Sequence, residues 1–236
     1  MALPPSGMSD EAFLREVDEE YRREQVLNVW RRYGRWIVGA VVVGLLALAL
    51  YLYLGQNSRN AAGKQGEEFD AALMLAAGNQ NDKALAEFDK IAKSGGNGYA
   101  AMSKITAGNL LLQKNDAKAA AAKFAEVAND SGLAKPYRDL ALLRQTVAEY
   151  DSLKPEVVID RLKNLAKPDS PWFGTAGEMV AASHLKLGHR DQAGKLYGQI
   201  AQGGENVPES IRQRAVQIAG VLGVDALDQS KEKQAQ

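Results

Sequence analysis

The stretch Trp36–Leu54, WIVGAVVVGLLALALYLYL, governs the organisation of the chain. It runs for 19 residues without a charged side chain. At about 1.5 Å per residue, a helix of this length matches the roughly 30 Å hydrocarbon layer of a bilayer. Trp36 lies at one end and Tyr51 and Tyr53 at the other, and such rings favour the lipid–water interface. We therefore predict a single transmembrane helix over residues 36–54.

Basic residues crowd the N-terminal side of this predicted span. Five arginines lie within 15 residues before it, at positions 22, 23, 31, 32 and 35, whereas only Arg59 and Lys64 follow at similar distance. Because Lys and Arg are retained on the cytoplasmic side, we expect the N-terminus inside and the rest outside. A cleaved signal peptide is the alternative, but it would have a short leader and an apolar core of about 7–15 residues. No small-x-small cleavage site follows Leu54, so the span is predicted to stay as an anchor.

The regions that flank the span are polar. Residues 1–35 are expected to form a cytoplasmic tail, with a disordered lead-in over residues 1–7 and a charged helix from an Asp10 N-cap to about Tyr33. Its apolar stripe fits a helix on the membrane surface or against a partner, and its many charges equally fit a solvated helix. Residues 55–66 are expected to become helical towards their end, and residues 225–236 to be disordered.

Composition narrows the classes of function. Lys plus Arg and Asp plus Glu both number 29, so no strong field draws the chain to nucleic acid. The chain has no cysteine, which excludes disulfides, zinc–thiolate sites and thiol nucleophiles. Alanine-rich stretches and scarce β-branched runs favour helices throughout. The predicted fold class is all-α.

Four sets of residues repeat after the span, with offsets of 36, 38 and 35 positions. Each set has the i, i+4, i+7, i+8 spacing of one helix face. The sets are Ala84, Phe88, Ile91 and Ala92; Ala120, Phe124, Val127 and Ala128; Val158, Leu162, Leu165 and Ala166; and Ala193, Tyr197, Ile200 and Ala201. Twelve residues before each set stand Ala72, Gly108, Thr146 and Ala181, mostly small residues.

Turn formers separate the two helices that each repeat implies. They are Gly78–Asn79, Asn115–Asp116 and Gly188, whereas Leu153–Lys154–Pro155 replaces the tight turn in the third repeat. Helix, turn and helix at a period near 34, with small residues where helices cross, is the tetratricopeptide pattern. We predict a right-handed α-solenoid of about four helix pairs over residues 55–224, closed by a capping helix from about Pro208 to Leu222.

In such solenoids the first helices of successive pairs line a concave surface that binds polypeptide. The candidate protein-binding residues are Lys104, Asn109, Arg138, Arg144 and Glu178. Tyr99, Tyr137 and Trp172 each stand 21 residues before the start of a set. These rings form either a ladder that grips peptide or staples that hold each helix against the preceding pair, and repeated aromatics favour the staples.

No motif points to catalysis. His184 and His189 are five residues apart with Gly188 between them, whereas a metal pair on a helix face needs i, i+4 spacing, so we expect surface or turn residues. The Gly95–Gly98 segment follows a predicted helix and lacks a GK[ST] sequence, so it reads as a turn. We expect no catalytic, cofactor or metal site, no small-molecule substrate and no enzyme. The absence of carboxylate and basic residues in the span argues against proton or ion transport.

The combined layout resembles the YfgM-like ancillary subunits of the bacterial Sec translocon, over about residues 15–222. The resemblance rests on Arg31–Arg32–Tyr33–Gly34–Arg35 before the span, on Gly98–Tyr99–Ala100–Ala101 opening a helix, and on the turn Gly188–His189–Arg190–Asp191–Gln192–Ala193. It implies an inner-membrane protein with periplasmic repeats that contact the translocon and periplasmic chaperones, and it carries over no catalytic residue.

The leading hypothesis is therefore a membrane-tethered interaction scaffold that assists protein export. An assembly factor that regulates a cell-wall or division synthase would use the same fold and is the alternative. An enzyme is a third class, which the lack of a catalytic constellation disfavours.

Overall fold

A computed structural model describes residues 8–94 and 96–225 of the 236-residue chain. The lead-in 1–7, Gly95 and the tail from residue 226 onward lie outside the described residues. The side chains of residues 8–29, 57 and 58 are also not described, so most of the apolar stripe of the N-terminal helix stays a prediction. The chain divides into two compact units, Met1–Ala61 and Ala62–Gln236.

One continuous helix, α1 (Met8–Ala77), runs for 70 residues through the predicted span. The predicted end of the first helix near Tyr33 is therefore wrong, and Asp10 lies inside the helix instead of capping it. Residues 55–66, which we expected to be helical only towards their end, are helical throughout. No proline occurs between Pro5 and Pro136. The glycines of α1 each cost about 1 kcal/mol of helix propensity but still donate their backbone hydrogen bonds. Nothing in this sequence stops the helix.

Within the part of the chain that the structure describes, one helical segment is long and apolar enough to cross a membrane. It lies in Trp30–Ala77, and none of its most apolar 18-residue window is buried. Trp36 is 77% exposed and Tyr51 74% exposed. A helix that is apolar all round and unburied is typical of a membrane span.

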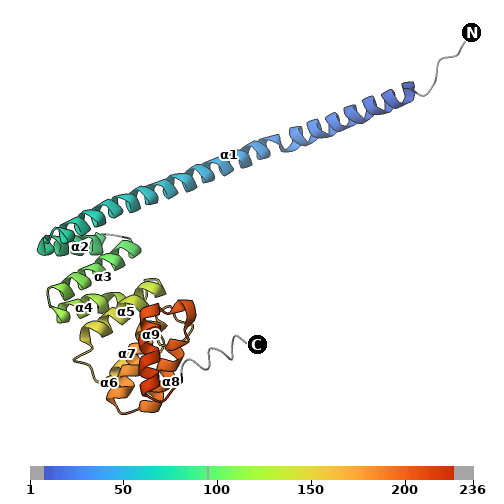
Figure 1. The fold of residues 1–236 in the computed structure, drawn as a ribbon. Helices are drawn as coiled ribbons and strands as arrows, with labels where there is room; N and C mark the ends of the chain where they lie inside the picture. The colour runs from blue at the N-terminus through green and yellow to red at the C-terminus, as the bar shows by residue number, and fades with distance from the viewer. Residues whose placement is uncertain (1–7, 95, 226–236) are drawn as a thin grey trace, which may run out of the picture. The chain divides into compact units, whose positions relative to one another are not determined.

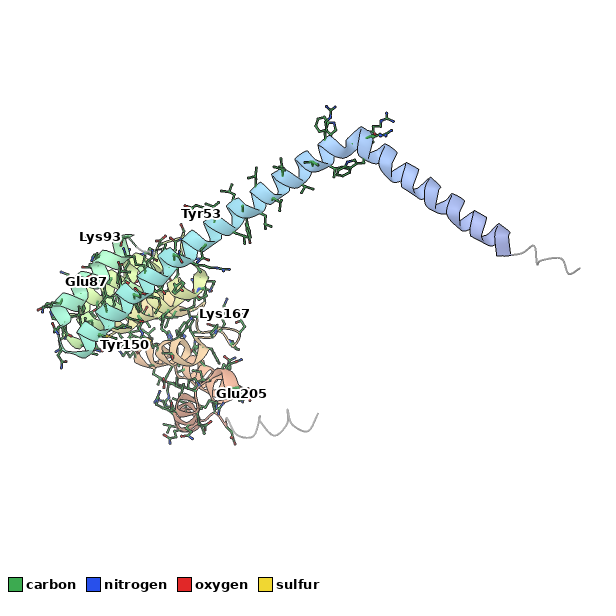
Figure 2. The ribbon with its side chains drawn as sticks, turned by 90° about the horizontal axis from the view of Figure 1, so that it is seen from above. Tyr53, Glu87, Lys93, Tyr150, Lys167 and Glu205 are labelled. Carbon is green, nitrogen blue, oxygen red and sulfur yellow. The ribbon has the colours of Figure 1, made fainter. Side chains whose placement is uncertain are left out.

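The second unit is a stack of helix pairs (Figure 1). Its helices are the end of α1 with α2 (Asn81–Ser94), α3 (Asn97–Gln113) with α4 (Ala117–Ala128), α5 (Lys135–Glu149) with α6 (Pro155–Leu162), and α7 (Phe173–Lys186) with α8 (Arg190–Ala201), followed by η1 (Gly204–Asn206) and α9 (Glu209–Val221). Figure 2 labels Glu87 on α2 and Glu205 in η1 near opposite ends of the stack. The predicted all-α solenoid with a capping helix is confirmed.

The core of the stack consists of four clusters that follow one another along the chain. Phe88, Phe124, Leu162 and Tyr197 lie in successive clusters, and each is at most 3% exposed. The same low exposure holds for the small, aliphatic and leucine positions of the four sets: Ala84, Ile91, Ala120, Val127, Val158, Leu165, Ala193 and Ile200. At Gly108 an added Cβ would lie 2.6 Å from Phe124 Cε1, so only a residue without a side chain lets α3 and α4 approach this closely.

Three inter-helix turns share one backbone geometry, in phase with the repeat. Asn79, Asn115 and Gly188 have φ of 58°, 60° and 77°, and each stands five residues before the small position of its set. The amide after each donates to the carbonyl five residues back, as in His189 N to His184 O at 2.9 Å. This is the Schellman motif, which satisfies carbonyls at a helix end and favours Gly or Asn at the left-handed residue.

The third pair departs from the others. α6 ends at Leu162, so the prediction that Leu165 continues the same helix is wrong. Leu165 instead lies in a turn, where its amide donates to Leu162 O at 2.9 Å and its side chain is still 3% exposed. Pro168 follows shortly, and a proline disfavours helix in the residue before it.

Candidate protein-binding site

An apolar hollow of about 180 Å³ opens between the first helices of three successive pairs. We call it the aromatic hollow; its lining residues are Phe69, Gly98, Tyr99, Met102 and Tyr137. They come from α1, α3 and α5, so the hollow crosses the stack instead of following one helix. Aromatic residues and Met are the side chains enriched where proteins bind one another.

Two tyrosines hold the first helices together and line the hollow at the same time. A Cβ on Gly66 would lie 2.9 Å from the Tyr99 hydroxyl oxygen, and one on Gly98 would lie 3.6 Å from that of Tyr137. Each ring therefore reaches back to a glycine on the preceding first helix. The Phe69 ring packs against Tyr99 with centroids 6.1 Å apart. The staple and ladder interpretations are compatible at these two positions.

Trp172 does not join this group. It occupies the N-cap position of α7, where its side chain makes no capping hydrogen bond. Its backbone amide donates to Ser170 Oγ at 3.2 Å, and its ring packs against the third core cluster. The three aromatic residues have the same sequence spacing, but two of them line the aromatic hollow and the third lies elsewhere.

Two of the five predicted binding residues are already paired within the domain. Lys104 Nζ lies 3.0 Å from a carboxylate oxygen of Glu126 on α4. Glu178 accepts two hydrogen bonds from Arg214 on α9, one of them from Nη2 at 2.8 Å. Both pairs join a first helix to another helix, so these charges contribute to the stack as well as to its surface.

The other three predicted residues differ in exposure. Arg144 is exposed, whereas Arg138 and Asn109 are half-buried. Arg138 Nε and Asn109 Oδ1 are buried without a hydrogen-bond partner among the described residues. No hydrogen bond or ion pair in the described part of the chain joins any two of the five predicted residues. They lie on α3, α5 and α7.

Sequence reasoning missed Phe69 and Met102 as lining residues. One signal was available for Met102, because it lies three residues after Tyr99 and such residues share a helix face. Phe69 could not be placed in this way, because its partner Tyr99 is on another helix, 30 residues along the chain.

A second, wider hollow of about 660 Å³ lies over α4 and the end of α5. Methyl groups and a charged rim line it: Ala117, Lys118, Ala121, Ala122, Ala125, Gln145, Ala148, Glu149, Asp151 and Ser152. Glu149 Oε2 accepts a hydrogen bond from Arg161 Nη1 of α6. Alanine buries little area, so this alanine groove offers less binding energy per side chain than the aromatic hollow.

The titratable groups with displaced pKa values lie at the other end of the stack. Burial lowers the pKa of His184, and the neighbouring His189 lowers it further. Burial raises the pKa of Tyr197, with the charge of Glu178 next in effect. Among the side chains that the structure describes, in residues 30–56, 59–94 and 96–225, no three of His, Cys, Asp or Glu group closely enough to hold a metal ion together.

Comparison with known families gives one match. The sequence model of the tetratricopeptide repeat-like domain matches residues 28–218, which is most of the chain. No curated protein and no solved structure matches.

Proposed function

Because the chain belongs to the tetratricopeptide repeat-like domain family, we propose that it is a membrane-anchored scaffold that binds polypeptide through the aromatic hollow. A domain of this family indicates a protein–protein interaction scaffold, a class that is typically non-catalytic. α1 supplies one segment suited to cross a membrane. The aromatic hollow is the observation that carries the proposal.

The hollow fits one apolar side chain of a partner. Phe69, Tyr99 and Tyr137 offer ring faces, and Met102 adapts to the shape of what enters. Burying one Leu or Phe side chain contributes about 1.5–3 kcal/mol, which alone gives weak binding. Confinement to the membrane raises the effective concentration of such a scaffold near other membrane proteins, so weak contacts suffice.

We further propose that the partners belong to protein export: the repeats lie in the periplasm and contact the Sec translocon and periplasmic chaperones. Two observations support this. The arginines before the span favour a cytoplasmic N-terminus. The sequence also resembles the ancillary translocon subunits through the Arg31–Arg35 segment and the Gly188–Ala193 turn.

Site-specific photo-crosslinking in living cells tests the proposal. A photoreactive residue at Met102 samples the hollow, one at Ala122 samples the alanine groove, and one at the exposed Lys93 of α2 is the control (Figure 2). We expect translocon subunits or chaperones in crosslinks from Met102 and not from Lys93. Crosslinks to cell-wall or division synthases would instead support the alternative assembly role.

A charge test complements the crosslinking. Arg144→Glu reverses an exposed charge on α5, whereas reversing Arg138 would also disturb a buried Nε. Surface charge orients a partner more than it anchors one, so Arg144→Glu should slow association. If Met102→Gln and Arg144→Glu both fold and retain every partner, binding does not use the first helices.

A further inference from the structure

The turn between α7 and α8 brings the two histidines of the chain together. His184 Nδ1 and His189 Nδ1 are 3.5 Å apart, and the ring centroids are 5.7 Å apart. The spacing of five residues would place the rings on different faces of a continuous helix. It is the left-handed Gly188, with φ of 77°, that reverses the chain and makes them face each other.

The backbone holds this arrangement in place. His189 N donates to His184 O at 2.9 Å, and Gly188 N donates to Leu185 O at 3.0 Å. These are the two hydrogen bonds of a Schellman motif, in which the side chains at the first and last of the six residues commonly touch. His184 and His189 occupy those two positions, where an apolar contact is usual.

The other two inter-helix turns of the same geometry carry different residues there. The corresponding pairs are Leu75 with Gln80 and Leu111 with Asp116, joined by backbone hydrogen bonds of 2.9 Å. Leu75 and Leu111 pack against the core clusters of their own repeats. Only the last of these three turns replaces both positions with imidazoles, so the histidine pair is not a requirement of the turn.

We propose that His184 and His189 form a two-ligand site for a divalent transition-metal ion of the kind that prefers imidazole, such as Zn²⁺ or Cu²⁺. Two nitrogens bound at about 2.0–2.1 Å to a tetrahedral ion lie about 3.4 Å apart. The observed Nδ1–Nδ1 distance of 3.5 Å matches that spacing with the turn as it stands. Binding replaces the Nδ1–Nδ1 hydrogen bond, and each neutral ring then carries its proton on Nε2.

The surroundings suit an ion that enters from solvent. His189 is exposed and His184 half-buried, so water can complete the coordination shell. Cu²⁺ should bind more tightly than Zn²⁺, as expected for nitrogen ligands. The site lies at the turn between α7 and α8, on other elements than the aromatic hollow of α1, α3 and α5, and does not depend on the proposed scaffold role.

The chain makes the experiment direct, because it has two histidines and no cysteine. The full chain is purified in detergent with a tag that lacks histidine and is titrated calorimetrically with ZnCl₂ and with CuCl₂. We expect one ion per chain. His184→Gln and His189→Gln should each weaken binding at least about tenfold, since even residues beyond the ligands of metal sites are worth roughly 10–100-fold.

Two further variants separate the turn from its side chains. Gly188→Ala keeps both imidazoles but strains the left-handed residue, and it should also weaken binding. Lys195→Gln, an exposed change on α8, should leave the affinity unchanged. Circular dichroism checks the fold of every variant. The proposal is overturned by no saturable binding, by one ion shared between two chains, or by a folded single-histidine variant with the parent's affinity.

Discussion

Phe124 shows how a single ring carries the packing of one repeat. It is fully buried in the second core cluster, and its ring edge faces Gly108 of α3. Phe124→Ala should lower the free energy of unfolding by about 3–5 kcal/mol, because the ring leaves a cavity that the neighbouring helices fill only in part. Urea unfolding followed by circular dichroism measures the change. A loss under about 0.5 kcal/mol, the range of surface substitutions, would show that this ring does not support the repeat.

Adding a side chain at Gly108 should overpack the contact between Gly108 and Phe124. Gly108→Ala would place a methyl group 2.6 Å from Phe124 Cε1, so the ring or the helix must move. Such overpacking costs about 1–3 kcal/mol and outweighs the gain of about 1 kcal/mol from helix propensity. Gly220→Ala in α9 is the matched control, because a Cβ there meets nothing within 4 Å and should leave stability equal or higher.

Tyr197 should make the stability of the stack fall at alkaline pH. Burial raises its pKa above the usual value of 10.0, and the charges of Glu178 and ionised Tyr150 raise it further. The unfolded chain therefore releases this proton first, so the stabilisation is complete below pH 10.0 and is lost as the pH rises through the folded-state pKa. In thermal unfolding, Tyr197→Phe should lose less stability than the parent across that window. Equal losses would show that another group controls alkaline unfolding.

Turns are the elements that set the phase of the repeats. Asn115 holds a φ of 60°, a conformation that costs most L-residues roughly 1–2 kcal/mol and that Asn and Gly tolerate. Asn115→Ala should lower the unfolding free energy by about 1 kcal/mol, whereas Asn115→Gly should come close to the parent. Denaturant midpoints of the three proteins decide the matter. Equal losses in both variants would point to the Asn side chain and not to the backbone.

Local pattern explains how much of the fold the sequence could predict. Small residues at crossing points, turn formers five residues before them and the final helix all follow from short-range rules. The early end of α6 could not be predicted in this way, because it depends on Pro168 and on Leu165 reaching the core from a turn. The full length of α1 could not be predicted either, because it depends on the absence of any residue that ends the helix.

The candidate site was predictable only in part, because its contacts join distant segments. Tyr99 and Tyr137 stand out from their spacing. The partners of Lys104 and Glu178, however, are 22 and 36 residues away. Such pairs are set by the packing of one helix on another, which the spacing within each helix does not encode.

The repeat unit should fold without the membrane segment. Its four core clusters lie within residues 69–224, and each is completed by neighbouring pairs of the same stack. Stability in such arrays comes from each pair and its contacts with the next. A chain of residues 62–225 should therefore be soluble, helical and cooperative in thermal unfolding followed by circular dichroism. A non-cooperative melt would show that the span, or what it binds, completes the fold.

The charges beside the span predict how the chain is oriented in the membrane. Five arginines stand within 15 residues before the span, against Arg59 and Lys64 at similar distance after it. Basic residues resist translocation, so Ser9 should face the cytoplasm and Glu205 the periplasm. Because the chain lacks cysteine, Ser9→Cys and Glu205→Cys each introduce one thiol that a membrane-impermeant maleimide can report without background. In intact spheroplasts only the Glu205→Cys variant should react, and both should react after lysis. Labelling of Ser9→Cys alone before lysis would show the opposite topology, in which the repeats cannot meet a periplasmic partner.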